Sequence, residues 1–225
     1  MKLDKEEILG KIMVGMTNDK ALDWAKRKGV ELQKLMAYYK CAMMEIETKF
    51  KVLNEEYSLQ FDRNPISSIK CRIKKVPSIL EKLERKGLPI TVESIEENLN
   101  DVAGVRVICS FPEDVYTLAN ALLKQDDITL LERKDYIEAP KKNGYRSLHL
   151  IVSVPIFLHN EKKLMKVEIQ LRTIAMDCWA SLEHQLHYKK DKEFTSEMEL
   201  ELIECARLSM ELDNKMDALR KQADI

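Results

Sequence analysis

The amino-acid sequence predicts an α/β protein in which a mixed β-sheet is flanked by helices, with further helical segments towards both ends of the chain. Near the ends, apolar residues recur every three or four positions, as on one face of an amphipathic helix. The middle instead alternates short β-branched runs with helix-like segments. With only 6 Gly and 6 Pro in 225 residues, of which 45% are hydrophobic, the composition is that of an ordered globular protein.

The N-terminal helical segment covers residues 20 to about 60, as one long helix or two. Apart from Gly29 it contains no Gly or Pro, and Asp-Arg-Asn-Pro at 62–65 ends it. A further helix is predicted over 77–86, because Gly87 follows it as a helix-terminating residue.

The central segment predicts four strands and one helix. A β-branched run at 105–109 follows Gly104, and a helix over 112–124 has Pro near its first turn. Three further strands are expected at 128–137, 145–156 and 163–173. We expect a mixed sheet with helices covering one face.

Two more helices complete the chain. The first covers 174–188. The second begins at Ser196, with Glu199 three positions on as a capping box, and continues to about residue 219.

Charge and cysteine content exclude several classes of protein. The net charge of −1 gives no general attraction to nucleic acid or membranes. The 5 cysteines form no C-x-x-C pair, which favours reduced thiols in the cytoplasm. The N-terminus lacks the apolar region of a signal peptide, and no apolar run is long enough to span a bilayer. We therefore expect a cytoplasmic protein that does not bind membranes.

Polar side chains alternate with apolar ones along two of the predicted strands. In the segment 166–173, Val167, Ile169 and Leu171 face one way, as in any surface strand. If this strand pairs with the one that follows the Asn-Gly turn at 143–144, six polar or aromatic groups line one face and favour a ligand site: Tyr145, Ser147, His149, Glu168, Gln170 and Arg172.

Asp101 lies just before the predicted strand at 105–109, and Arg106 lies inside it. Asp101 either caps a turn and pairs with Arg106, or joins Glu168 at neighbouring strand ends. The second arrangement suits Mg²⁺, which proteins hold through one or two carboxylates together with substrate phosphates.

A basic run covers residues 70–86, where seven Lys and Arg residues outnumber two Glu. Such a run is typical of a solvated face. In a chain without net positive charge, it also suits a metal–polyphosphate ligand, whose oxygens the cations would neutralise.

Four motifs, in their order along the chain, resemble the RelA/SpoT-type alarmone synthetase domain. They are IKCRIKKVPSILEKLERKG, NDVAGVRVIC, RKDYIEAPKKNGYRSLHL and VEIQLRTIAMDCWASLEHQLHYK. The likeness covers about residues 65–189. Because neither a hydrolase region nor regulatory domains are recognised, the chain resembles a small alarmone synthetase. The resemblance implies a nucleotidyltransferase-like fold, with an N-terminal helical extension at 1–62, the synthetase domain at 63–190 and a C-terminal helix for packing and assembly at 191–225.

The resemblance implies transfer of the β,γ-pyrophosphate of ATP to the 3′-hydroxyl of GDP or GTP, with Mg²⁺ as cofactor and a homotetramer as the assembly. Nucleic acid is not expected as a primary partner. Two alternatives remain. The first is a toxin-like synthetase that uses an adenine nucleotide or tRNA as acceptor. The second is a non-catalytic nucleotide- or RNA-binding module.

The matching positions imply roles for individual residues. Asp101 matches a Mg²⁺ ligand, and Glu168 matches a second acidic residue that binds Mg²⁺ or acts as the base. Arg72 and Arg106 match a pair that stacks on adenine, a use that suits planar guanidinium groups. The ATP phosphates would meet Lys74, Lys82 and Arg85.

For the acceptor nucleotide, Tyr145 matches a tyrosine that stacks on guanine. Lys141, the turn at Asn143 and His149 would hold the edge and phosphates of the nucleotide. The motif also includes Gln170, Arg172 and Glu183. In the segment PISSIKCR, some relatives bind a product between subunits through an aromatic residue and a threonine. This chain departs from that pattern with Ser68 and Lys70, so the resemblance leaves open whether pppGpp or another effector activates the protein.

Overall fold

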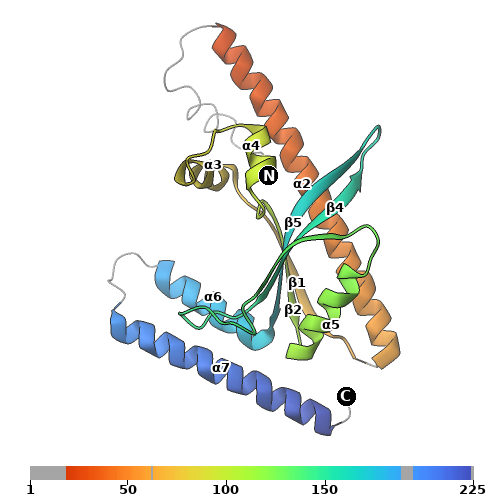
Figure 1. Ribbon diagram of the computed structural model, residues 1–225, viewed down its shortest axis with the longest axis vertical. Helices are drawn as coiled ribbons and strands as arrows, with labels where there is room; N and C mark the ends of the chain where they lie inside the picture. Colours follow the sequence, from red (N-terminus) through yellow and green to blue (C-terminus); the bar gives the residue numbers. More distant parts are fainter. Residues whose placement is uncertain (1–18, 62, 189–194, 224–225) are drawn as a thin grey trace.

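The computed structural model describes residues 19–61, 63–188 and 195–223, and the described chain forms a five-stranded mixed sheet flanked by helices (Figure 1). The strand order is β1-β2-β5-β4-β3; β2 and β5 are parallel, and the other neighbours are antiparallel. The strands are β1 Ile66–Ile73, β2 Ala103–Cys109, β3 Thr129–Asp135, β4 Leu148–Phe157 and β5 Lys162–Thr173. The helices are α2 Asp19–Phe61, α3 Val76–Arg85, α4 Val92–Asn98, α5 Pro112–Leu123, α6 Ile174–Tyr188 and α7 Ser196–Gln222.

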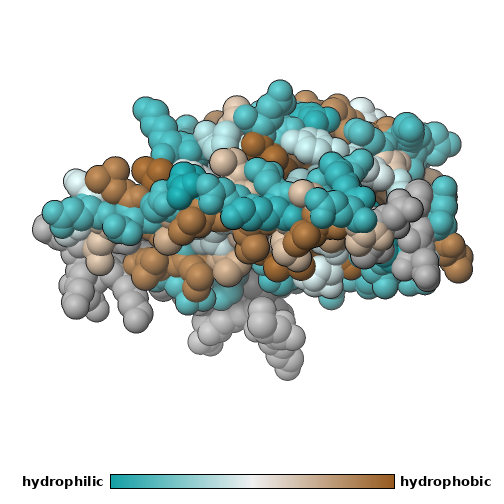
Figure 2. Space-filling view, turned by 90° about the horizontal axis from the view of Figure 1, so that it is seen from below, coloured by the Kyte–Doolittle hydropathy of each residue, from teal (hydrophilic) through white to brown (hydrophobic). Residues whose placement is uncertain are grey.

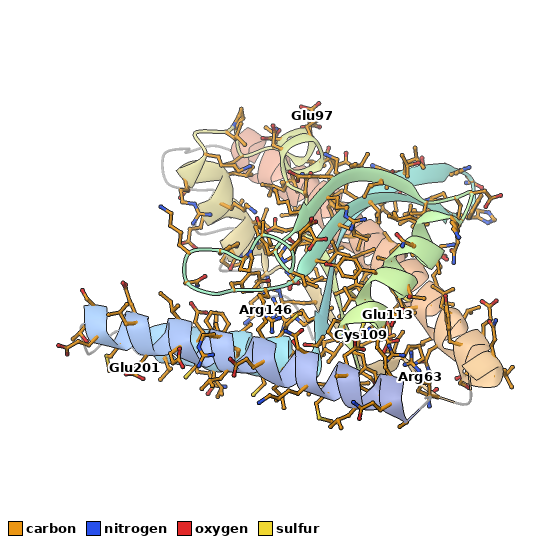
Figure 3. All side chains as sticks on the ribbon, turned by 60° about the horizontal axis from the view of Figure 1, so that its bottom comes forward. Arg63, Glu97, Cys109, Glu113, Arg146 and Glu201 are labelled. Carbon is orange, nitrogen blue, oxygen red and sulfur yellow. The ribbon has the colours of Figure 1, made fainter. Side chains whose placement is uncertain are left out.

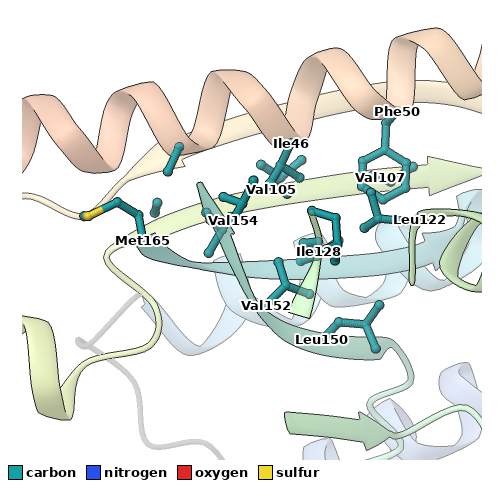
Figure 4. Packing of buried hydrophobic residues seen from close by; sticks show 14 of the residues in the cluster. Ile46, Phe50, Val105, Val107, Leu122, Ile128, Leu150, Val152, Val154 and Met165 are labelled. Carbon is teal, nitrogen blue, oxygen red and sulfur yellow. The ribbon is translucent and has the colours of Figure 1, made fainter. Parts of the chain in front are cut away.

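The long helix α2 crosses one face of the sheet and forms much of the core. It is one continuous helix of 43 residues rather than two. Ile46 and Phe50 are fully buried against Val105 and Val107 of β2, and Leu122 of α5 joins the same cluster (Figure 4). This packing explains the three- and four-residue spacing of apolar residues in the sequence. None of the described helices is both long and apolar enough to cross a membrane.

The predicted elements differ from the structure at β1, at α4, at the start of β4 and at the cap of α7. Strand β1 and the short helix α4 were not predicted as such, because β1 is an edge strand with mostly exposed side chains and α4 has only 7 residues. Strand β4 begins at Leu148, so the three residues before it reach their positions through a loop. The cap of α7 is Thr195 rather than Ser196, since the Thr195 hydroxyl accepts the Met198 N–H at 3.3 Å.

The domain limits inferred from the resemblance remain predictions. The limit at 190 and 191 lies outside the described residues, as do residues 1–18 and 62 of the N-terminal extension.

The sheet separates a core face from a polar face. On β5, Val167, Ile169 and Leu171 are buried, whereas Glu168 and Gln170 alternate with them, as the sequence pattern predicted. The register places Gln170 between Arg106 of β2 and His149 of β4. Paired residues share a face, so these side chains converge on the side opposite α2.

Candidate active site

A pocket of about 440 Å³ lies on the polar face, over β1, β2 and β5. It brings together six residues that the sequence predicted for the site: Arg72, Asp101, Arg106, Glu168, Gln170 and Arg172. Lys70, Cys71, Gly104 and Val105 complete its lining. Residues from three separate segments of the chain, around 70–72, 101–106 and 168–172, therefore meet at one cavity.

Asp101 lies just before β2 and is held by two lysines. Its Oδ2 accepts hydrogen bonds from Lys74 Nζ at 2.5 Å and Lys82 Nζ at 2.7 Å. Burial would raise the pKa of Asp101, but the hydrogen bonds and charges of the two lysines outweigh it and lower that pKa. The turn-cap alternative, in which Asp101 pairs with Arg106, is wrong, because Arg106 pairs with Asp177 instead.

Glu168 lies on β5 opposite Gly104 of β2. Its carboxylate accepts a hydrogen bond from Gln170 Nε2 at 3.1 Å and lies 3.6 Å from His149 Nδ1. Burial and the charge of Asp101 would raise the pKa of Glu168, but the contacts with His149 and Gln170 outweigh them and lower it. Glu168 is therefore ionised at neutral pH.

These two carboxylates fit a Mg²⁺ ion that is shared with phosphates. Within the described chain, Asp101 Oδ1 is buried and has no hydrogen-bond partner, which leaves a ligand atom available. The described residues contain no cluster of three or more His, Cys, Asp or Glu side chains suited to a metal. Two carboxylates with phosphate oxygens are a usual coordination set for Mg²⁺.

Asp177, in the first turn of α6, organises the cations of the pocket and was missed by the sequence analysis. Its carboxylate pairs with Lys70 at 2.9 Å, Arg106 at 3.1 Å and Arg172 at 3.5 Å. Burial would raise the pKa of Asp177, but these three cations lower it. The sequence shows Asp177 as an acidic residue in the first turn of the helix that follows the strand of Glu168 and Gln170. Arg85, by contrast, is exposed at the end of α3 and is outside the pocket lining.

Next to the pocket, aromatic rings form a second cluster around Tyr145. Its hydroxyl lies 2.6 Å from Arg172 Nη2 and 2.8 Å from His149 Nε2. The Lys141 ammonium lies 4.7 Å from the ring centroid of Tyr145 and 4.6 Å from that of Tyr136. Tyr136 was not predicted from the sequence, although it is in the same motif.

The loop before β4 sets the position of Tyr145. Asn143 Oδ1 accepts the Tyr145 N–H at 3.2 Å, and Asn143 Nδ2 donates to Glu183 at 3.3 Å. Gly144 has a φ of 86°, which explains the glycine in this turn. Ser147 does not line the polar face as predicted. It is fully buried, and its hydroxyl donates to the Leu171 carbonyl.

Comparison with known proteins identifies the family. Residues 71–193 match the model described as "Region found in RelA / SpoT proteins". The chain is 46% identical over 186 residues to GTP pyrophosphokinase YwaC of Bacillus subtilis, covering 83% of this chain and 89% of that protein. The crystal structure of small alarmone synthetase 2 from Bacillus subtilis superposes with a TM-score of 0.78 at 42% identity, covering 85% of this chain and 99% of that one.

The structure of small alarmone synthetase 1 from Bacillus subtilis, bound to its product pppGpp, gives a TM-score of 0.77 at 34% identity, covering 85% of this chain and 97% of that one. The family model covers more than half of the chain, and the relatives match most of it. The chain therefore belongs to the RelA/SpoT family.

Proposed function

We propose that the protein is a GTP pyrophosphokinase that transfers the β,γ-pyrophosphate of ATP to the 3′-hydroxyl of GDP or GTP, giving AMP and ppGpp or pppGpp. The observation that carries the proposal is one cationic pocket with two carboxylates, Asp101 and Glu168, next to the aromatic cluster of Tyr145. One relative is named a GTP pyrophosphokinase, and a similar structure contains pppGpp as product.

The donor nucleotide is assigned to the side of the pocket formed by β1, β2 and α3. In the β1–β2 register Arg72 pairs with Gly104 and Arg106 pairs with Lys70, so the two arginines lie two positions apart on the same face and would stack on adenine. Lys74 and Lys82 would turn from Asp101 to the ATP phosphates once Mg²⁺ neutralises that carboxylate. Arg85 would act as a further phosphate contact at the rim.

The acceptor nucleotide is assigned to the cluster beside the pocket. The Tyr145 ring would stack on guanine, which requires the Lys141 ammonium to move off the ring and onto the phosphates. Asn143 and His149 would contact the edge and phosphates of the nucleotide. Gln170 and Arg172 connect this cluster to Glu168 and Asp177.

In the transfer step, the acceptor's 3′ oxygen forms a bond to the β-phosphorus of ATP, and the bond from that phosphorus to the α–β bridging oxygen breaks as AMP leaves. The proton of the 3′-hydroxyl passes to Glu168. Asp101 and Glu168 are the residues that would hold Mg²⁺, which would supply charge neutralisation for the phosphates. Arg72, Arg106 and the two lysines position the donor, which is most of what such transfer needs.

The apolar faces of the terminal helices favour a homo-oligomer, proposed here to be a tetramer. The near-neutral net charge and the free cysteines of the described chain favour a cytoplasmic enzyme that acts on nucleotides rather than nucleic acid.

The first test is a radiolabel assay. Purified protein, Mg²⁺ and γ-labelled ATP are incubated separately with GDP, GTP, AMP, ADP and bulk tRNA, and the products are resolved by thin-layer chromatography. Label in ppGpp or pppGpp supports the proposal and gives the acceptor preference. Label in an adenosine product or tRNA replaces it with the toxin-like alternative. Absence of transfer to any acceptor by the folded protein favours the binding module.

A further inference from the structure

Arg146 is buried directly beside the acceptor cluster and has no role in the proposed reaction. It follows Tyr145 in the chain, and its side chain points towards α7 (Figure 3). Its Nη2 donates to Asp213 Oδ2 at 2.8 Å, and the two side chains are only 7% and 5% exposed. A buried ion pair thus joins the loop that carries Tyr145 to Asp213 of α7, which lies 67 residues away from Arg146 in sequence.

The same oxygen of Asp213 also holds Thr173, the residue after Arg172. Thr173 Oγ1 donates to Asp213 Oδ2 at 3.0 Å and accepts the Met176 N–H at 3.1 Å at the start of α6. One carboxylate oxygen on α7 is therefore bonded to the chain neighbours of Tyr145 and of Arg172. These two residues contact one another at 2.6 Å in the acceptor cluster.

Helix α7 contacts the acceptor loop at a second point. A Cβ added at Gly144 would lie 2.4 Å from Ala206 Cβ, so the loop rests directly on α7. The Tyr145 ring also packs against the small cluster of Trp179, Ala180 and Ala206. The position of α7 therefore sets the position of the Tyr145 loop.

The ion pair is a poor choice for stability alone. Removing two charges from water is costly, and apolar side chains of similar size often stabilise a buried site equally well. Burial raises the pKa of Asp213 even though Thr173 and Arg146 oppose the shift. Unlike apolar packing, the ion pair fixes the geometry of its partners, because one carboxylate oxygen accepts hydrogen bonds from two donors at once.

We propose that Asp213 is a positioning residue for the acceptor-binding cluster. Through Arg146 and Thr173, it fixes Tyr145 and Arg172 in their positions relative to one another. This inference rests on the proposed function, because it assigns the Tyr145 cluster to the acceptor. It makes α7 part of the substrate-binding machinery, beyond any role in assembly.

The test compares Asp213→Asn with Asp217→Asn. Asp217 lies one turn further along α7 and pairs with Arg220 and Lys221, away from Arg146. The measurements are GDP affinity by calorimetry, the KM for GDP, the KM for ATP and the Tm. Asp213→Asn should weaken GDP binding and raise the KM for GDP by about tenfold, since small misplacements of a binding group are amplified. The KM for ATP should stay unchanged, and Asp217→Asn should match wild type.

A double variant separates positioning from stability. Arg146→Met with Asp213→Leu removes both buried charges, so the Tm should return to near wild type while GDP binding stays weak. Recovery of GDP binding together with the Tm would overturn the proposal, as would equal increases in both KM values for Asp213→Asn. If wild type used another acceptor, the proposed function would fail, but the same variants measured with that acceptor would still decide the role of Asp213.

Discussion

At the scale of single residues, the pocket places two ionised carboxylates among a larger number of cations. Asp101 is neutralised by Lys74 and Lys82, whereas Glu168 contacts His149 and the Gln170 amide. Under the proposed function, Asp101 is the carboxylate whose lysine partners would have to exchange on binding of metal-bound ATP.

Glu168→Gln should greatly lower turnover while leaving the fold and GDP binding close to wild type. The substitution keeps the shape of the side chain and removes only its charge and basicity, a loss typically worth about 10²–10⁴ in rate. Single-turnover synthesis, ATP and GDP affinities and Tm check the prediction, with Glu97→Gln on the exposed face of α4 as control. Near-wild-type synthesis by Glu168→Gln would remove Glu168 from the mechanism.

Tyr145→Ala should weaken binding of the acceptor nucleotide more than binding of ATP. Loss of one aromatic platform for a base costs about 1–3 kcal/mol, which corresponds to a rise of about 5- to 150-fold in the KM for the acceptor. Tyr145→Phe keeps the ring but loses the hydroxyl contacts with Arg172 and His149, so its effect should be smaller. Equal defects in the two variants would show that the hydroxyl, rather than the ring, carries the binding.

At the scale of elements, regular patterns were readable from the sequence, whereas contacts between distant segments were not. The alternation on β5 predicted which residues share the polar face, and the heptad-like spacing of α2 predicted its buried side. The strand assigned to 145–156 was wrong at its start, because the Asn143–Gly144 turn continues through Ser147 and pairing begins at Leu148.

The residues missed at the site share a physical cause. Asp177 reaches Lys70 across 107 positions and Arg106 across 71, and Asp213 reaches Arg146 across 67. No local spacing encodes such contacts, since they depend on how α6 and α7 pack. Asp101 and Glu168 were predicted to meet because both lie near the ends of predicted strands, and the resemblance separately matched each of them to an acidic residue. The structure places both in the lining of one pocket.

Gly144→Ala tests how closely the acceptor loop rests on α7. Its φ of 86° costs an L-residue roughly 1–2 kcal/mol, and the added methyl would overlap Ala206. Gly87→Ala is the matched control, because Gly87 has a φ of 65° but no atom within 4 Å of an added Cβ. Urea unfolding should show a larger loss in the free energy of unfolding for Gly144→Ala than for Gly87→Ala. Gly144→Ala should also bind GDP more weakly. Equal losses would mean that α7 yields to the extra methyl.

At the scale of the whole molecule, the carboxylates of the site connect function to acid stability. The pKa values of Asp101, Asp177 and Glu168 lie below their ordinary values of 3.8, 3.8 and 4.5. Each contributes stability that is fully present above its ordinary pKa and lost as the pH falls through the lowered value. Asp213, with its pKa raised by burial, acts in the opposite direction.

The free energy of unfolding should therefore begin to fall below about pH 4.5 and continue to fall below pH 3.8. Chemical denaturation at a series of pH values measures this loss. Asp177→Asn should be less stable than wild type at neutral pH, and its free energy of unfolding should fall less on acidification. A parallel pH dependence in the variant would contradict the assigned role of Asp177.

Helices α6 and α7 leave an apolar groove of about 710 Å³ whose walls include Leu182, Leu208 and Met216. Seen from the side of α7, brown apolar side chains lie among charged ones on this face (Figure 2). Leu208 is 50% exposed in the single chain, and Leu182 is 54% exposed. A contiguous apolar surface of this kind favours burial against another copy of the chain.

We expect a homo-oligomer, with a tetramer as the proposed state, and Leu208→Glu should lower its mass because a charge would be buried at the contact. Analytical ultracentrifugation checks this, with Leu59→Glu as control, since Leu59 is 88% exposed on α2 and lies outside the groove. A monomeric wild type would refute assembly through this face. An unchanged mass in Leu208→Glu would show that the subunit interface lies on another face of the molecule. Because α7 also carries Asp213, loss of assembly accompanied by a raised KM for GDP would show that subunit contacts and acceptor binding depend on the same helix.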